Sequence, residues 1–320
     1  MKPSLFLGLA IFLIASTGYA QYTDVINSNR PGSSYSAYAV GTNVLQVEGG
    51  LFYDHRDHSG LNTTANQFGL NYVVRYGLFF EQLEIILDGS YAYEKVKDHS
   101  TLPEYSYNQS DFQSNTIGAK YLIYDPFKKN NTPNLYSWKA NNTFQWKNLI
   151  PAIAVYAGAN FNFGDNPFHP EDPTVSPKVM LATQHHLTPK WVLVTNLIYD
   201  KFTGDDPLFN YIITLTHALN DRRYTVFAEH QGYKSDLYGD GVFRVGAARL
   251  IGTDLQVDAA LGTNIKDTPK RYFGSIGLSW RWDKHKDKAV DVDNISNQEK
   301  RAIKKRNRKN KKGIFEIDEN

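Results

Sequence analysis

Apolar and polar residues alternate along much of the chain, as residues 67–77, QFGLNYVVRYG, show clearly. One parity of this stretch is apolar or aromatic and the other is mainly polar: Phe68, Leu70, Tyr72, Val74 and Tyr76 oppose Gln67, Asn71 and Arg75. Because successive side chains of a strand point to opposite faces, the stretch predicts a strand with one wet and one apolar face. The alternation fits either a soluble sandwich or a membrane barrel whose apolar face meets lipid.

The pattern recurs in twelve segments, an even number. They are residues 44–54, 67–76, 79–93, 112–124, 151–163, 177–186, 190–200, 208–218, 224–233, 242–250, 254–263 and 272–282. Most hold ten residues or more, whereas strands of a soluble sandwich most often have about 5 to 6. Such lengths suit tilted strands that cross a bilayer.

The links between these segments alternate in length. With the N-terminus in the periplasm, the links on that side are tight turns: 77–78, 187–189, 220–223 and 252–253. The links on the other side are mostly longer and rich in Asp, His, Lys, Asn and Pro: 55–66, 94–111, 164–176, 201–207, 234–241 and 264–271. Short periplasmic turns and long outer loops are typical of outer-membrane barrels. Residues 125–150 break the alternation and could hold a short helix or an extra hairpin, which would make fourteen strands.

The N-terminus indicates export. Residues 1–20 carry Lys2, an apolar run and small residues up to Ala20, which predicts a cleaved signal peptide rather than a membrane anchor. The chain contains no cysteine, so disulfides, thiolate metal sites and N-terminal acylation are excluded. No later window approaches the ~20 apolar residues of a membrane helix. We therefore predict an all-β protein, an antiparallel up-and-down transmembrane β-barrel over residues 44–282, in the outer membrane of a Gram-negative bacterium, with its apolar face in contact with outer-membrane lipid.

Three stretches carry a resemblance to a known family. They are NSNRPGSSYSAYAVGTNVLQVEGGLFYDH (residues 27–55), LQVDAALG (255–262) and the Gly-rich last strand, RYFGSIGLSWRW. They resemble the bacterial outer-membrane transporter-like family named for the meta-cleavage pathway of phenol degradation. Asn29 stands where that family usually has Asp, and residues 125–150 and the tail after Trp282 depart from its pattern. The resemblance implies a barrel that passes small molecules, such as aromatic or hydrophobic ones.

The polar parity of the strands predicts which side chains face the lumen. The lumen-facing set is Glu48, Asp54, Arg75, Glu84, Asp88, Glu94, Lys120, Lys178, Asn196, Asp200, Glu229, Arg244, Asp258 and Arg281. Because like charges repel at low dielectric, opposite partners are expected across neighbouring strands. The set either forms a pairing network that fills the interior or lines a narrow pore. Residues 21–43 are either a disordered leader or a plug whose Arg30 pairs with a lumen acid such as Glu48.

Catalytic and metal chemistry have little support. His185, His186, His217 and His230 invite a hydrolase reading, but no serine lies beside them on the same face. The DHRDH stretch, residues 54–58, is expected to be solvated in an outer loop rather than to bind metal. We predict no enzyme activity, no metal site and no cofactor.

The tail after the last strand changes composition. Residues 283–320 form a basic segment in which residues 300–312 hold nine Lys or Arg and no acid, so we expect a disordered periplasmic tail. A helix over 297–306 and strand addition by GIFEIDE are both conceivable. Nucleic acid is an implausible partner for an exported chain, whereas anionic lipid, cell-wall polymer or a periplasmic protein could contact residues 300–312.

Two functions remain open. The first is a channel or transporter for small molecules. The second is a structural or adaptor barrel that binds a periplasmic partner through its tail and residues 125–150, without transport. Liposome flux would separate the two.

Overall fold

The computed structural model describes residues 25–127, 146–170, 172–204 and 206–285. The chain divides into two compact units, residues 1–284 and 285–320, and the fold below is that of the first. The predicted signal peptide and nearly all of the predicted tail lie outside the described residues. Within the described part, no helix has the length and apolar character needed to cross a membrane.

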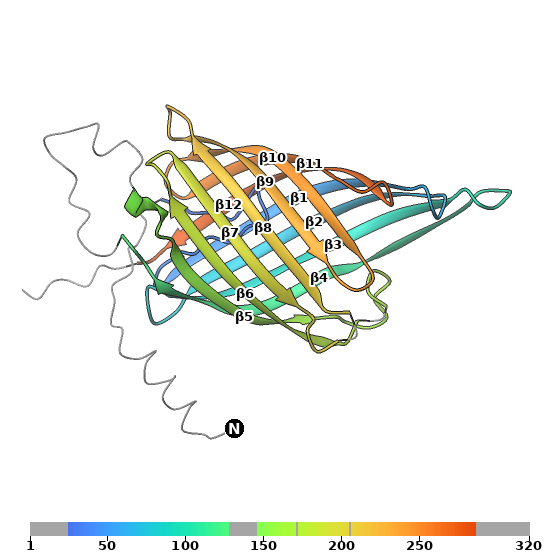
Figure 1. The fold of residues 1–320 in the computed structure, drawn as a ribbon, viewed down its shortest axis with the longest axis horizontal. Coiled ribbons are helices and arrows are strands. Elements are labelled where there is room, and N and C mark those ends of the chain that lie inside the picture. The colour runs from blue at the N-terminus through green and yellow to red at the C-terminus, as the bar shows by residue number, and fades with distance from the viewer. Residues whose placement is uncertain (1–24, 128–145, 171, 205, 286–320) are drawn as a thin grey trace, which may run out of the picture. The chain divides into compact units, whose positions relative to one another are not determined.

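Twelve strands form one closed antiparallel barrel in which each strand pairs with its neighbours in sequence and β12 pairs with β1 (Figure 1). The strands are β1 (Val44–His58), β2 (Thr63–Gly77), β3 (Leu83–Asp98), β4 (Tyr105–Tyr124), β5 (Ala152–Phe161), β6 (Val175–His186), β7 (Trp191–Asp200), β8 (Leu208–Ala218), β9 (Tyr224–Lys234), β10 (Gly239–Ile251), β11 (Leu255–Asn264) and β12 (Lys270–Asp283). The predicted class and the count of twelve are confirmed.

The described part of residues 125–150, which is 125–127 and 146–150, contributes no strand to the closed barrel. This described part includes a 3-10 helix, η1 (Trp146–Leu149), and a short helix was one of the two alternatives considered for the segment. Residues 128–145 lie outside the described residues.

The barrel wall is polar inside and apolar outside. On β1, Glu48 is 0 % exposed while Leu51 is 60 % exposed, and the same contrast separates Glu84 from Leu87 on β3. Exposed aromatic side chains gather toward both ends of the strands: Tyr53, Phe68, Tyr93, Phe112, Tyr199, Phe209 and Tyr272 at one end, and Tyr76, Trp191, Tyr224, Trp280 and Trp282 at the other. A closed, even-numbered barrel with an apolar outer band between aromatic belts is built for lipid. The chain is an outer-membrane barrel, and its short-turn end faces the periplasm.

Two sets of strand ends differ from the sequence prediction. β1 extends to His58, β3 extends to Asp98, and β4 starts already at Tyr105. Much of the predicted outer loops 55–66 and 94–111 is therefore paired strand. These arms carry polar residues on both faces, so they lack the alternation that marks a strand in lipid. Residues 79–82, predicted as strand, instead form the turn before β3, closed by the Leu78 N–H donating to the Leu83 carbonyl at 3.1 Å.

Candidate functional site: an inner collar bound by the lumen charges

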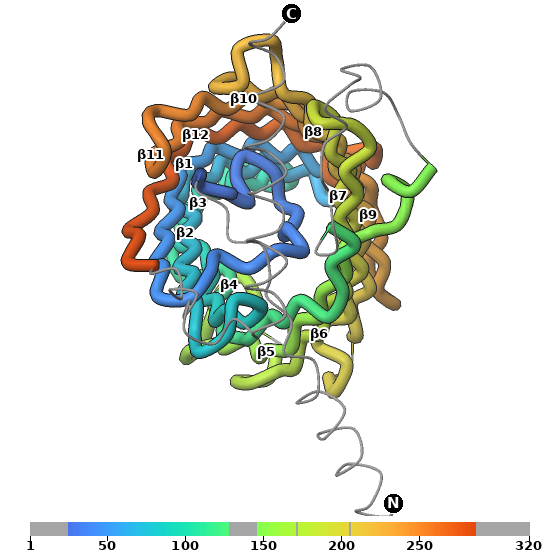
Figure 2. The backbone as a smooth tube through the Cα atoms, turned by 90° about the vertical axis from the view of Figure 1, so that its left-hand side faces the viewer, coloured from blue at the N-terminus to red at the C-terminus, as the bar shows by residue number. Residues whose placement is uncertain are grey.

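Residues 28–40 run round the inside of the barrel wall, and we call this segment the inner collar. Figure 2 shows the blue N-terminal segment within the ring of strands. Its polar contacts follow the wall strand by strand: Ser28 with β1 and β12, Arg30 with β11, Ser33 with β9, Tyr35 with β7, Ser36 with β6, Tyr38 with β4 and β2, and Val40 with β3. The described part of the predicted leader therefore lies in the lumen.

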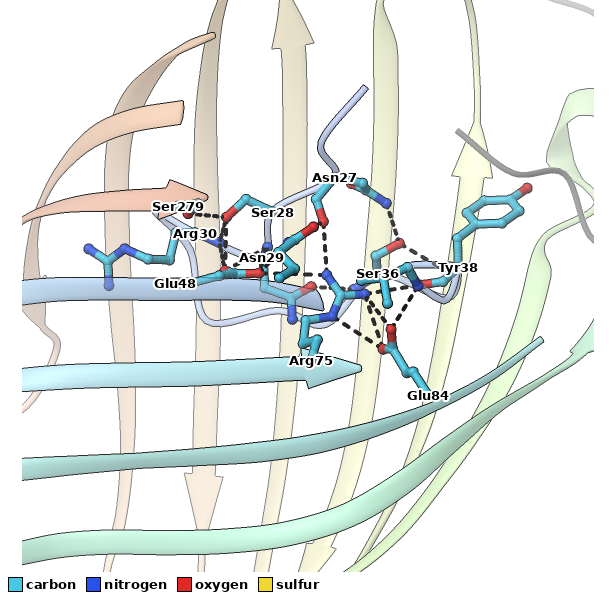
Figure 3. A network of polar contacts seen from close by, with 12 residues as sticks. Asn27, Ser28, Asn29, Arg30, Ser36, Tyr38, Glu48, Arg75, Glu84 and Ser279 are labelled. Carbon is cyan, nitrogen blue, oxygen red and sulfur yellow. Dashed lines mark hydrogen bonds and ion pairs between the residues drawn. The ribbon is translucent and has the colours of Figure 1, made fainter. Parts of the chain in front are cut away.

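The first residues of the inner collar bind Glu48 of β1 (Figure 3). This carboxylate accepts the Ser28 hydroxyl at 2.8 Å and the backbone N–H groups of Asn29 and Arg30, each at 3.2 Å. Gln46 holds the other oxygen of Glu48 at 2.7 Å and also donates to the Asn27 carbonyl. Successive backbone N–H groups that converge on one anion form a nest, so Glu48 fixes the path of the chain at this point.

Arg30 pairs with a different acid from the one expected. Its guanidinium Nη2 lies 3.1 Å from Asp258 Oδ1 on β11, whereas Glu48 binds only its backbone N–H. The guanidinium passes over Gly50 and Gly277, where an added Cβ would overlap it. Arg30 therefore pairs with one of the predicted lumen acids, with Asp258 rather than with Glu48, the acid given as the example. Glu48 is already occupied by backbone donors, and the two glycines leave a path across β12 toward Asp258.

Arg75, Glu84 and Lys120 form the charged centre under the other end of the inner collar, and all three side chains are fully buried. Glu84 accepts from Arg75 at 3.0 Å, from Lys120 at 2.7 Å and from the Val40 N–H at 2.9 Å. Both cations also donate to the Tyr38 carbonyl, at 3.2 and 3.0 Å. The network therefore pairs strand with strand, as expected, and also holds the inner collar.

The middle of the inner collar is held by Glu229 and Asn196. Glu229 accepts the Ser33 N–H at 2.9 Å and the Arg244 guanidinium at 2.7 Å. Asn196 binds the Tyr35 backbone twice, accepting its N–H at 2.6 Å and donating to its carbonyl at 2.9 Å. These are the contacts that a neighbouring peptide group would make, so Asn196 substitutes for a strand partner.

The Tyr35 side chain extends within the lumen away from the periplasmic end, and its hydroxyl donates to Asp88 of β3. Burial, followed by the nearby Asp88 charge, raises the pKa of Tyr35 well above its usual value. Through its bond to Asp88, the Tyr35 hydroxyl links the inner collar to β3.

An apolar layer lies beside Tyr35 on one side of the lumen. It consists of Val73, Ile86, Tyr156, Met180, Ile198 and Ile212, from β2, β3, β5, β6, β7 and β8. Ile86 and Ile212 are 0 % and 2 % exposed although they face inward, so side chains pack closely together on this side of the lumen. These inward apolar residues are absent from the lumen-facing set, which polar parity alone predicted.

Other predicted lumen residues pair away from the inner collar. Arg281 lies 3.0 Å from Asp254 in the turn before β11, near the periplasmic end. Asp54 pairs with Arg271 of β12, and Glu94 pairs with Arg56 at 2.7 Å. Asp200 accepts from Asn160 at 2.5 Å, and no ion pair is found for Lys178 among the described residues.

A cavity of about 680 Å³ opens between the inner collar and the periplasmic part of β6–β9. Its lining combines hydroxyls, amides, apolar groups and two basic residues, and includes Ser28, Ser34, Gln184, Val194, Thr214, Thr216, Thr225, Phe227, Arg30 and Lys147. Described carboxylates are absent from the lining, because the lumen acids are turned toward the inner collar or toward cations. The inner collar therefore narrows the mouth without filling it.

The histidines and the DHRDH stretch have ordinary structural surroundings. His185 contacts the Leu149 carbonyl, His217 packs on Trp191 and His230 packs on Phe243. Residues 54–58 belong to β1 rather than to an outer loop, which corrects the prediction. No group of three or more possible His, Cys, Asp or Glu ligands is found in the described ranges.

Three glutamines were the functional residues that the sequence prediction missed, although it included the amide of Asn196. Gln184 and Gln256 bind the inner collar through the Ser36 hydroxyl and the Arg30 carbonyl, and Gln46 binds the Asn27 carbonyl just before it. Each lies on the polar parity of its strand, so a search that included uncharged inward residues would have found them.

Comparisons with known proteins agree with this architecture. A family model described as "Putative MetA-pathway of phenol degradation" matches residues 28–282. Among curated proteins, none matches the chain.

Several solved barrels show a weak likeness. The COG4313 outer membrane channel from Pseudomonas putida F1 is 12 % identical, with 80 % of this chain and 100 % of that chain covered and a TM-score of 0.48. The translocator domain of autotransporter NalP from Neisseria meningitidis is 10 % identical, with 79 % and 90 % covered and a TM-score of 0.46. The CymD monoaromatic hydrocarbon channel is 7 % identical, with 77 % and 90 % covered and a TM-score of 0.40.

Proposed function

The chain belongs to the family of that model, and we propose that its barrel is a channel for small molecules whose periplasmic mouth is narrowed by the inner collar. One observation carries the proposal. The buried lumen charges hold the inner collar in the lumen, and a cavity of about 680 Å³ remains between the inner collar and β6–β9. A barrel with a purely structural role would gain more from a lumen packed by side-chain pairs alone.

The residues that line the cavity favour solutes that are at least partly apolar. The cavity presents Val192, Val194 and Phe227 together with threonine hydroxyls and the basic residues Arg30 and Lys147. A strongly charged solute would lose hydration against the apolar groups of this lining. Small aromatic or hydrophobic molecules that carry a polar group suit both the apolar and the polar groups of the lining. The family description, which concerns phenol degradation, supports the same class of solute.

Deleting residues 25–40 tests the proposal. The full-length chain and the deletion variant would be reconstituted in planar bilayers and in liposomes, with heat-modifiable gel mobility as the control for folding. We expect higher single-channel conductance and faster uptake of small solutes by the deletion variant. An unchanged conductance from a folded barrel would contradict a role for the inner collar at the mouth.

The adaptor function depends mainly on segments outside the described residues, 128–145 and 286–320, and no contact of the described residues favours it. The same liposomes address it. Absence of solute flux through both the full-length barrel and the deletion variant would favour an adaptor over a channel.

A further inference from the structure

The outward face of the barrel carries a polar band just beyond its outer aromatic belt. Strand register places two rows of outward residues side by side across β12, β1, β2 and β3. The first row is Tyr272, His55, Asn66 and Lys95, and the second is Lys270, Asp57, Thr64 and Lys97. We call these eight residues the outer polar band.

Lys95 and Lys97 continue the line of side chains that faces lipid lower on β3. Along this strand Tyr91 and Tyr93 are 41 % and 45 % exposed, and Lys95 and Lys97 are exposed as well. The intervening Ala92, Glu94 and Val96 are buried. The two lysines therefore follow the aromatic belt on the same outer surface.

Their height matches the headgroup region of a membrane. With a rise of ~3.3 Å per residue and a tilt of ~45°, Lys95 lies about 5 Å and Lys97 about 9 Å beyond Tyr93 along the bilayer normal. Tyrosines at a membrane boundary mark the level where acyl chains end and headgroups begin. Two ammonium groups are thus held where lipid phosphates lie.

The lysines are free to bind an external anion. Neither Lys95 nor Lys97 has an ion-pair partner within the described ranges, because the neighbouring carboxylate of Glu94 points inward and pairs with Arg56. Asp57 is the one acid in the outer polar band. Asn66 and Thr64, beside the lysines in the register, add an amide and a hydroxyl.

We propose that the outer polar band binds the phosphate groups of a phosphorylated glycolipid, the lipopolysaccharide of the outer leaflet. The apolar surface directly below it, with Leu51, Leu70, Leu87 and Ile276 exposed, covers the acyl chains of the same molecule. This continuity favours a lipid over a free phosphate, which would gain nothing from that surface. The band lies at the end of the strands away from the inner collar and the short turns, which is the outer side. The inference rests on the membrane location and not on transport.

Binding of lipopolysaccharide by the purified full chain tests the proposal. A fluorescent rough lipopolysaccharide and the same lipid after enzymatic dephosphorylation would be titrated in mixed micelles at 0.1 M salt. A lysine near an anionic lipid surface is worth about a fivefold change in affinity. We therefore expect Lys95→Gln/Lys97→Gln to bind the phosphorylated lipid about 30-fold more weakly, and the wild type to lose affinity for the dephosphorylated lipid to a similar extent.

Two control variants sharpen the test. Lys95→Arg/Lys97→Arg keeps both charges and should bind within about twofold of the wild type. Lys234→Gln removes an exposed lysine at the outer end of β9, on another part of the barrel, and should also have little effect. Equal weakening by Lys234→Gln, or an unchanged affinity in the Lys95→Gln/Lys97→Gln variant, would overturn the proposal. Because conductance is measured in bilayers without this lipid, either result leaves the channel proposal to its own test.

Discussion

Replacing Glu84 by Gln should loosen the inner collar while the barrel stays folded. Glu84 is fully buried, compensates the charges of Arg75 and Lys120 and accepts the Val40 N–H. Its amide isostere still offers an acceptor to Val40 but leaves one of the two buried cations uncompensated. Removing one partner of a buried ion pair costs about 3–5 kcal/mol. Water that enters beside Val40 would hydrate the unpaired cation, so displacement of the inner collar should recover much of this cost.

Thiol labelling measures that displacement. The chain has no cysteine, so Val40→Cys provides a single thiol at a position only 6 % exposed. If labelling requires the inner collar to open, a change of ~3 kcal/mol corresponds to labelling roughly 150-fold faster in the Glu84→Gln background. Glu104→Gln, at an exposed outer carboxylate, is the matched control and should leave the rate unchanged. Equal labelling rates in the Glu84→Gln variant and the control, with both barrels folded, would refute the reasoning.

Other substitutions separate neighbouring positions. Gly50→Ala should displace the Arg30 guanidinium and raise conductance, whereas Gly49→Ala, whose added Cβ would meet only a backbone oxygen at 3.9 Å, should behave as wild type in the same recordings. Ile212→Asn should hydrate the apolar layer and raise ion conductance without impairing assembly; unaltered conductance would show that this layer does not limit flow. Ile213→Arg faces lipid and should destabilise the assembled barrel by ~2–4 kcal/mol, seen as a lower temperature for the heat-modified gel shift.

The membrane-crossing parts of the fold could be predicted from the sequence because lipid imposes strict alternation on them. Glu48, Glu84 and Asp258 were assigned inward by parity alone, and all three are buried. Where lipid no longer contacts the strand, the signal disappears. The outer part of β4, from Tyr105, is polar on both faces and could not be distinguished from a loop.

The parity of a residue in its strand predicts which face of the barrel wall it occupies. It does not predict the level of the residue along the barrel axis or its interaction partner. Arg30 was expected to pair with a lumen acid such as Glu48, and the glycines at 50 and 277 let its side chain reach Asp258 on β11 instead. The inner collar itself carries no periodic pattern, because it is held by side chains of the wall rather than by a ladder. Its path therefore required the structure.

The charge pattern of the lumen divides the inner collar into two parts. Arg75 and Lys120 are balanced by Glu84 and Glu48, so displacement of residues 36–40 would break hydrogen bonds but separate no charges. Arg30, by contrast, is the cation paired with Asp258 in the described structure, and its displacement would leave a buried carboxylate alone.

Hydrogen bonds exchanged with water cost only about 0.5–1.5 kcal/mol each, whereas an orphaned buried charge costs several times more. The part near Val40 is therefore the easier one to release, although it is joined directly to β1, and the part near Arg30 is the firmer attachment. This asymmetry favours a mouth that widens beside β3 and β4 while the Arg30 end remains bound.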